Sequence, residues 1–159
     1  MHVFERTFEE MQVEDIILFN FDGKAVSSNR SPSQGIEFHH GIYKQREDVP
    51  AIVHSHGFWI TAQAAFAHPP HILNHVSTVF YERTAVSPND NFASISQSLG
   101  SDDIAIVIPR HGAITLGSTL GEAESRHVVF DCTARMDVTL PTSAPTMPIE
   151  QCSSLSGMV

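Results

Sequence analysis

The sequence is poor in basic residues and in cysteine, and each shortage excludes a class of protein. Nine lysines and arginines stand against eighteen acidic residues, which gives a net charge of -9. This balance leaves no basic face for nucleic-acid phosphates or for an anionic membrane, so we expect neither partner. Two cysteines, Cys132 and Cys152, are too few for a disulfide framework, and we expect a reducing, cytoplasmic compartment.

Long hydrophobic runs are also missing. The longest apolar stretch, about residues 51–67, is interrupted by two histidines and is too short to span a bilayer. The first residues lack the charged-then-apolar pattern of a signal peptide. A chain of 159 residues with 42% hydrophobic content fits one domain that is large enough to bury a core.

Short segments of strand and helix character alternate along the chain, which predicts a central sheet with helices packed against it. The expected strands are a hairpin within residues 15–26 and runs at 51–56, 78–81, 104–108 and 113–117. The expected helices are 36–46, 58–67, 92–99 and about 118–136. From Pro141 onward proline, serine and threonine dominate without an apolar period. We therefore expect one domain over residues 1–140 and a flexible C-terminal tail over residues 141–159.

Histidine is unusually frequent for a chain of this length, with ten residues. His54 and His56 lie two apart in a predicted strand, so both imidazoles project to one side and Ser55 to the other. Alone, such a pair could equally face solvent or be hydrogen-bonded. His111 follows the apolar run at 104–108 and stands beside Gly112, at a strand end where functional groups often lie. Together the three histidines match a catalytic metal site with an open position.

Three blocks, residues 19–24, 39–56 and 110–120, resemble the class II aldolase/adducin family in order and spacing. The resemblance covers roughly residues 13–136. It implies an α/β fold of three αβα layers with a central mixed or antiparallel sheet. It also implies that His54, His56 and His111 bind a catalytic divalent metal, usually zinc or manganese. Members of the family form rings, so a homo-oligomer, with a tetramer favoured, is expected.

Local cues at residues 4–7, at residues 13–16 and at His75 are similar to the decarboxylase branch of this family. The sequence departs from the aldolase pattern at Gly35, where the aldolases carry a metal-binding, acid/base glutamate. Glu37 stands two residues on, roughly 200° around a helix, so it does not simply substitute. The loops that cradle a sugar phosphate in the family have no counterpart here, so we expect a substrate without phosphate.

Four further residues are candidates for catalysis, and two of them have a simpler alternative. Glu37 could act as a repositioned acid/base, or be a surface carboxylate in the first turn of a helix. His75 could line the pocket and donate a proton, and Arg110 could meet a substrate carboxylate or pair with surface acids. By resemblance alone, Tyr81 lies near the site of a neighbouring subunit.

These features favour a metal-dependent carbon–carbon lyase that acts on a small hydroxy or oxo carboxylic acid. Decarboxylation ranks above retro-aldol cleavage, because it needs a proton donor for the carbanion but no base for a hydroxyl. Two alternatives stay open. One is a metal-dependent isomerase, epimerase or cyclase, and the other is a non-catalytic interaction protein such as adducin, whose relatives lose the histidines that remain here.

Overall fold

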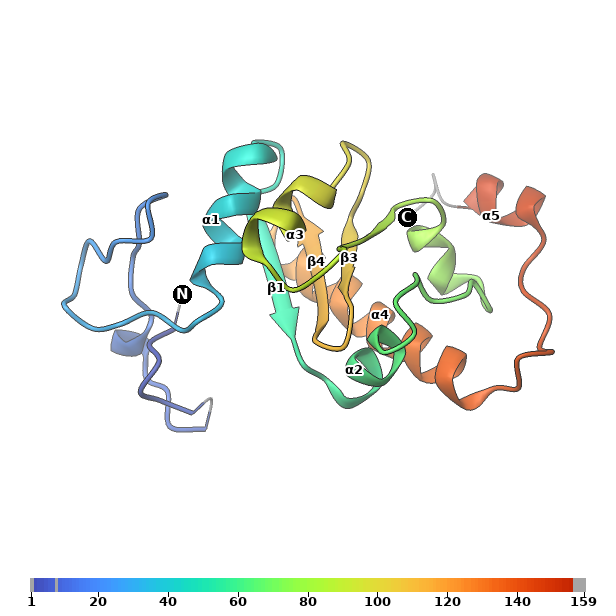
Figure 1. Ribbon diagram of the computed structural model, residues 1–159, viewed down its shortest axis with the longest axis horizontal. Helices are drawn as coiled ribbons and strands as arrows, with labels where there is room; N and C mark the ends of the chain where they lie inside the picture. Colours follow the sequence, from blue (N-terminus) through green and yellow to red (C-terminus); the bar gives the residue numbers. More distant parts are fainter. Residues whose placement is uncertain (1, 8, 156–159) are drawn as a thin grey trace. The chain divides into compact units, whose positions relative to one another are not determined.

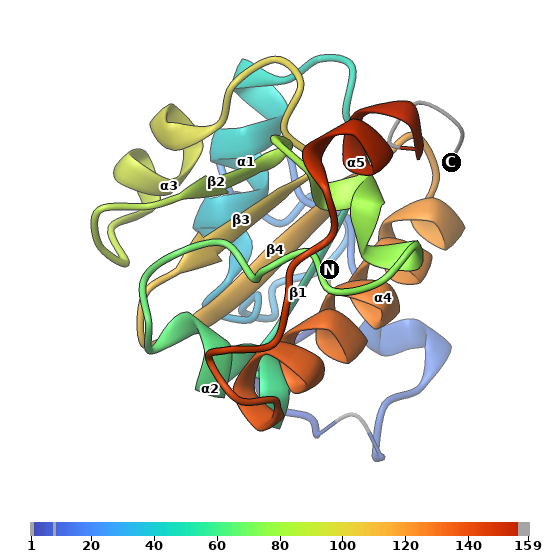
Figure 2. The same cartoon turned by 90° about the vertical axis from the view of Figure 1, so that its right-hand side faces the viewer.

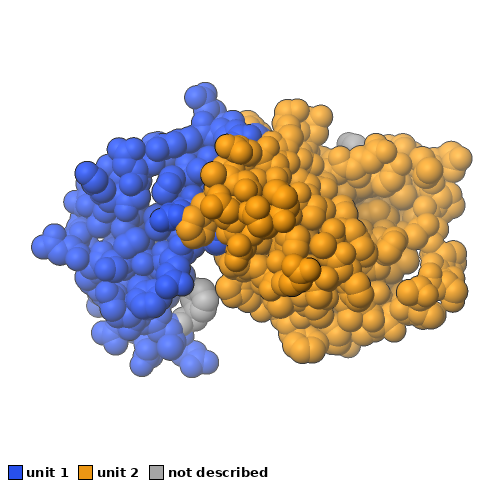
Figure 3. All heavy atoms as spheres, in the orientation of Figure 1, with its two compact units in different colours: residues 1–47 blue, residues 48–159 orange. Residues whose placement is uncertain are grey.

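A computed structural model describes residues 2–7 and 9–155, and the chain divides into two compact units, Met1–Glu47 and Asp48–Val159 (Figure 3). The boundary between the units follows the first long helix. It differs from the division at residue 140 that the composition suggests.

The first unit contains a 3-10 helix, η1 (Val13–Asp15), and one α-helix, α1 (Ile36–Gln45). Helix α1 matches the predicted helix, and it buries Phe38 and Ile42 four residues apart on one face. The expected two-stranded hairpin at residues 15–26 is wrong. This segment forms a loop with two isolated bridges, one between Phe19 and Ala25 and one between Ile16 and His2.

The side chain of Asn20 explains why residues 15–26 form a loop. Its amide oxygen accepts hydrogen bonds from the backbone N–H groups of Asp22 and Lys24, at 3.0 and 2.9 Å. Gly23, at a φ of 76°, completes the tight turn. The asparagine side chain thus takes the N–H group of Lys24 that a regular ladder would pair with the carbonyl of Asn20, which is how Asx residues compete with secondary structure.

The second unit is built on a mixed four-stranded sheet in the order β1 (Ala51–Ser55), β4 (Gly112–Gly117), β3 (Ala105–Ile108), β2 (Thr84–Val86). Figure 1 shows β1, β4 and β3 side by side, and Figure 2 also shows β2 beside β3. The β1–β4 and β3–β4 pairs are antiparallel, and β2 pairs with β3 in parallel. Every residue of β3 and β4 is buried, so the middle of the sheet is covered on both faces. The predicted α/β class with a mixed sheet is confirmed.

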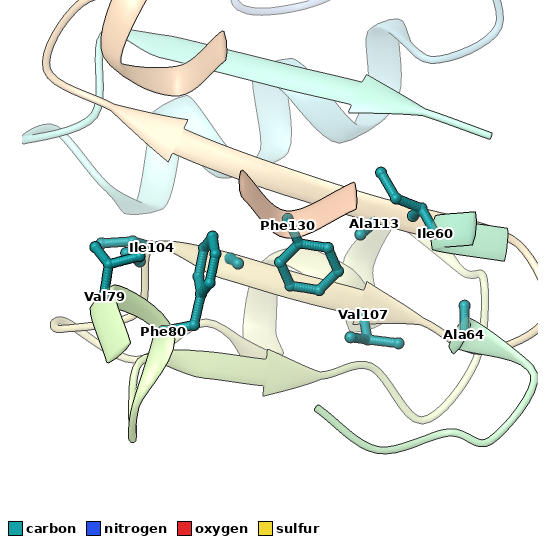
Figure 4. Close-up of a cluster of buried hydrophobic side chains, with 9 residues drawn as sticks. Ile60, Ala64, Val79, Phe80, Ile104, Val107, Ala113 and Phe130 are labelled. Carbon is teal, nitrogen blue, oxygen red and sulfur yellow. The ribbon is translucent and has the colours of Figure 1, made fainter. Parts of the chain in front are cut away.

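Five helices accompany this sheet: α2 (Phe58–Ala64), η2 (Val76–Phe80), α3 (Phe92–Ser98), α4 (Leu120–Thr139) and α5 (Ile149–Leu155). Helix α4 runs along β1 and β4 and also packs against α2 (Figure 2). In the core, the rings of Phe80 and Phe130 meet edge to face with their centroids 5.1 Å apart (Figure 4). Around them lie Ile60, Ala64, Val79, Ile104, Ala105, Val107 and Ala113.

One predicted element in this unit is wrong, and one strand was missed. The expected strand at 78–81 is the 3-10 helix η2, and the strand β2 was not predicted. The hydroxyl groups of Ser77 and Thr78 donate to the carbonyls of Asn74 and His75, at 2.8 and 2.7 Å, and so hold the chain in a turn. Helix α2 ends at Ala64 rather than at residue 67.

The segment predicted as a flexible tail contains helix α5. The side chain of Cys152 in this helix is only 1% exposed, and the N–H of Met147 donates to the carbonyl of Ile72 at 2.8 Å. The tail therefore makes contacts with other parts of the second unit, while its mobility stays a prediction. In the described part of the chain, no helix is long and apolar enough to cross a membrane.

Candidate metal centre

Strand β1 positions two of the predicted metal ligands. Its partner β4 aligns His54 with Ile114 and Ser55 with Ala113, so the two neighbours face opposite sides of the sheet. The hydroxyl of Ser55 lies 2.7 Å from Nε2 of His127 on helix α4. The His54 ring lies instead beside His56, with their Nε2 atoms 3.0 Å apart. The pairing of the two imidazoles that alternation predicts is thus present.

The third histidine comes from the turn between β3 and β4. The N–H of His111 donates to the carbonyl of Ile108 at 3.0 Å, which closes the turn. Arg110, at its apex, has a φ of 61°, a left-handed conformation that is uncommon outside glycine. Its N–H donates to the carbonyl of Ala64 at 3.1 Å, and Thr61 Oγ1 lies 3.4 Å from the carbonyl of His111. Helix α2 therefore holds this turn at two points.

Gly112 permits the close approach of the turn to β1. A Cβ atom at this position would lie 2.5 Å from the backbone oxygen of Ser55 and 3.3 Å from Cδ2 of His56. The first distance is too short for any side chain, and the second is tight, so β1 and the turn come together at this point only over a glycine. This contact brings His111 against His54 in β1 and His56, the residue that follows the strand.

The three imidazoles converge on one point. Their ring centroids are 4.9, 5.3 and 4.5 Å apart, and one ring nitrogen from each lies within 4.8 Å of the others. Nitrogen ligands at 2.0–2.1 Å from a tetrahedral zinc ion are about 3.3 Å apart, close to the 3.0 Å between the Nε2 atoms of His54 and His56. The donor set therefore fits a divalent metal.

Hydrogen bonding, burial and charge favour the neutral, metal-binding form of two of these rings. Nδ1 of His54 lies 2.9 Å from the carbonyl of Ala113, which makes it the protonated nitrogen and leaves Nε2 as a lone-pair donor. Burial lowers the pKa of His111, and nearby His56 lowers it further. A proton is thus disfavoured on His111, and the neutral form is the one that binds metals.

An open hollow of about 600 Å³ adjoins the histidine cluster. It is lined by His56, Phe58, Thr61, Ala62, Arg110 and His111. The exposed ring of Phe58 and the methyl of Ala62 give it an apolar side, and the exposed guanidinium of Arg110 gives it a positive charge. The hollow can therefore accept a small molecule with an anionic group next to the three histidines.

The other predicted site residues lie elsewhere. His75 caps the start of η2, and Tyr81 follows its end, and neither is among the residues that line the hollow. Burial raises the pKa of Tyr81, and the adjacent carboxylate of Glu82 raises it further. Glu37 is exposed in the first turn of α1 in the first unit, and Gly35 is the N-cap of that helix.

A buried polar network behind β1 was not predicted from the sequence. His127 on α4, only 7% exposed, contacts the hydroxyl of Ser55 through Nε2 and that of Thr115 through Nδ1, at 2.7 and 3.0 Å. The hydroxyl of Thr115 also donates to the carbonyl of Ala123 at 2.9 Å. This network joins β1, β4 and α4 directly beneath the metal-binding face. One signal in the sequence was available: Ser55 lies between two histidines that share one face of the sheet, so its hydroxyl must lie on the other face, where α4 packs.

Comparison with known proteins decides the family. The sequence matches the family described as "Class II Aldolase and Adducin N-terminal domain" over residues 2–138. The chain belongs to this family. This class II aldolase/adducin chain is 26% identical over 129 residues to an L-fuculose phosphate aldolase of Methanococcus maripaludis, with 78% of this chain and 69% of the relative covered.

Two further relatives extend the comparison. The class II chain is 26% identical over 146 residues to the L-ribulose-5-phosphate 4-epimerase UlaF of Salmonella paratyphi B, covering 81% of this chain and 64% of the epimerase. The solved L-fuculose 1-phosphate aldolase of Glaciozyma antarctica superposes with a TM-score of 0.82 at 26% identity, covering 93% of this chain. The chain spans 61% of the length of that solved protein.

Proposed function

We propose that this class II aldolase family member is a divalent-metal-dependent carbon–carbon lyase. The observation that carries the proposal is the convergence of His54, His56 and His111 on one point beside an open hollow. Three neutral nitrogen ligands with a further open position are the donor set of catalytic zinc sites. Zinc or manganese is the proposed metal.

A divalent metal held there would act as a Lewis acid toward the negative charge that develops on a substrate oxygen when a carbon–carbon bond breaks. The three histidines carry no charge of their own when neutral, so they leave the positive charge of the metal uncompensated. The hydrogen bond from His54 to the carbonyl of Ala113 keeps that ring in a fixed orientation. The rigid sheet beneath it, fully buried in β4, limits movement of the ligand set.

Arg110 is the proposed anchor for the substrate. Its guanidinium lies on the hollow next to His111, and its backbone is fixed by the bond to Ala64. A guanidinium binds a carboxylate through two parallel hydrogen bonds, which sets the orientation of the substrate. Phe58 and Ala62 would contact the apolar part of the same molecule. We therefore propose a small hydroxy or oxo carboxylic acid as the substrate.

Decarboxylation is the proposed reaction within the lyase class. Aldol cleavage requires a base for a substrate hydroxyl, and Gly35 has no side chain to serve as one. Decarboxylation requires only a proton donor for the carbanion. Tyr81 is a candidate, because a phenol carries its proton at neutral pH, and His75 is a second. Both lie outside the hollow of their own chain, so we propose that they act across a subunit interface in a homo-oligomer, with a tetramer favoured.

A second candidate is aldol cleavage or epimerisation of a sugar phosphate. The relatives support it, since they are an L-fuculose phosphate aldolase and an L-ribulose-5-phosphate 4-epimerase. Arg110 suits a phosphate as well as a carboxylate, because each presents two oxygens that accept parallel hydrogen bonds from a guanidinium. In this case Glu37, the nearest carboxylate in sequence to Gly35, would be the acid/base.

The two candidates differ in the product released. The purified protein, loaded with zinc or with manganese, is assayed for carbon dioxide from a panel of hydroxy-aromatic and β-keto acids. In parallel, aldehyde release from L-fuculose 1-phosphate and epimerisation of L-ribulose 5-phosphate are measured. We expect carbon dioxide release that His111→Ala abolishes and that Glu124→Gln, an exposed change on α4, leaves intact. Aldehyde release or epimerisation alone would establish the second candidate, and silence in all assays would refute a lyase.

A further inference from the structure

A second cluster of metal-binding residues lies in the same unit and shares no residue with the first. His68 and His71 belong to the loop between α2 and η2, and Asp137 lies in the last turn of α4. Nδ1 of His71 lies 2.7 Å from Oδ1 of Asp137, and the rings of the two histidines have centroids 5.1 Å apart. One ligand atom from each residue lies within 4.8 Å of the others.

The carboxylate of Asp137 is the unusual member of this cluster. Its side chain is only 9% exposed, and its buried Oδ2 has no hydrogen-bond partner among the described residues. The bond to His71 satisfies Oδ1 alone. A buried carboxylate oxygen without a donor is unfavourable, because the water that it loses on folding is not replaced. A cation at this point would provide the missing partner.

Two imidazole nitrogens and one carboxylate oxygen are ligands of choice for zinc and similar divalent ions. Nδ1 of His68 lies 2.6 Å from the carbonyl of Pro69, so Nδ1 is the protonated nitrogen and Nε2 is the metal-binding one. The carbonyl of His68 accepts a bond from the buried Gln63 side chain at 2.7 Å, which fixes the backbone of the loop. The His71 side chain is 56% exposed, so its imidazole has room to shift and make space for a cation between it and Asp137.

We propose that His68, His71 and Asp137 form a second divalent-cation site, of the zinc class, that fastens the loop after α2 to the end of α4. The cation replaces the hydrogen bond between Nδ1 of His71 and Oδ1 of Asp137, and the carboxylate can also bind it through Oδ2. Because the carbonyl of Ile72 also accepts from the N–H of Met147, the clip adds to the attachment of the C-terminal segment. The site is structural, since nothing in it adjoins the hollow at His111. It does not depend on the lyase proposal.

The test uses the full chain with the first cluster removed by His54→Ala and His111→Ala. This variant is stripped with a chelator and titrated with zinc chloride, and with cobalt chloride as a spectroscopic probe of coordination. We expect one equivalent to bind and the midpoint of thermal unfolding to rise by roughly 5–10 °C at a zinc concentration about a hundredfold above Kd. Adding Asp137→Asn, which keeps the shape of the side chain, should weaken binding at least tenfold.

Two matched controls show whether the effect is specific. Glu124→Gln removes a negative charge from the exposed side of α4, and His75→Ala removes an exposed histidine near the same loop. Neither should change the zinc affinity of the stripped variant. If zinc does not bind, or if it binds equally after Asp137→Asn, the site does not exist. Should the double variant fail to fold, wild type is titrated instead, and Asp137→Asn must then lower its zinc capacity from two equivalents to one.

Discussion

Gly112→Ala tests how the metal-binding face is assembled. The added Cβ would lie 2.5 Å from the backbone oxygen of Ser55, whereas ordinary van der Waals contact begins at 3.4 Å. The difference, 3.4 minus 2.5, means that β1 and the turn must separate by about 0.9 Å. Metal–ligand distances tolerate only about 0.2 Å of error, so the three histidines could no longer bind one ion well. We expect metal affinity to fall at least tenfold, by analogy with the loss of supporting contacts around metal sites.

The same change should lower the free energy of unfolding of the metal-free protein by about 1–3 kcal/mol, as overpacking does in other cores. Gly121→Ala is the matched control, because nothing lies within 4 Å of a Cβ there and the residue is in helix α4. It should raise the free energy of unfolding by about 0.5–1 kcal/mol and leave the metal affinity unchanged. Both variants are measured by urea unfolding and by zinc competition with a chelator, in an Asp137→Asn background. Unchanged affinity in Gly112→Ala would refute the account of the close approach.

Three other changes separate the remaining roles. Arg110→Gln should raise KM at least tenfold with a smaller decrease in kcat, because it removes a substrate contact. A decrease in kcat as large as the increase in KM would contradict the role of Arg110 as the substrate anchor. Glu37→Gln should lower turnover less than about tenfold, and a loss of several hundredfold with metal retained would make it the acid/base. Burial lowers the pKa of His127 below 6.5, so its contribution to stability is full above pH 6.5 and is lost as the pH falls through the folded value. In urea unfolding of the metal-free protein, the free energy of unfolding should therefore decrease less between pH 7.5 and 5 for His127→Gln than for wild type. An identical decrease in the two proteins would exclude this role for His127.

Much of the sheet was predictable because its signals are local. The continuous apolar run at 104–108 indicated a strand covered on both faces, and β3 is buried throughout. The alternation of His54, Ser55 and His56 predicted which side chains share a face, and Ser55 does turn toward α4. The convergence of His111 with the other two was expected from its place after a strand. That these residues bind a metal stays a prediction.

The elements that were missed depend on contacts distant in sequence or on side chains that compete with the backbone. Strand β2 is three half-buried residues long and exists through its parallel pairing with β3. Three residues are too few to show the hydrophobic periodicity from which a strand is predicted. The segment at 78–81 has strand-forming residues, but the hydroxyls of Ser77 and Thr78 bond to the preceding turn. Helix α5 packs against the rest of the second unit through the buried side chain of Cys152, and composition alone does not reveal this contact.

The central claim is that His54, His56 and His111 hold one divalent metal, and elemental analysis tests it most directly. Wild type, the His54→Ala/His111→Ala variant and His75→Ala are purified without chelator and exchanged into metal-free buffer. We predict that the double variant retains about one equivalent of zinc or manganese less than wild type, and that His75→Ala matches wild type. Metal-free wild type that also takes up no zinc or manganese on titration, or a double variant with wild-type metal content, would contradict the claim.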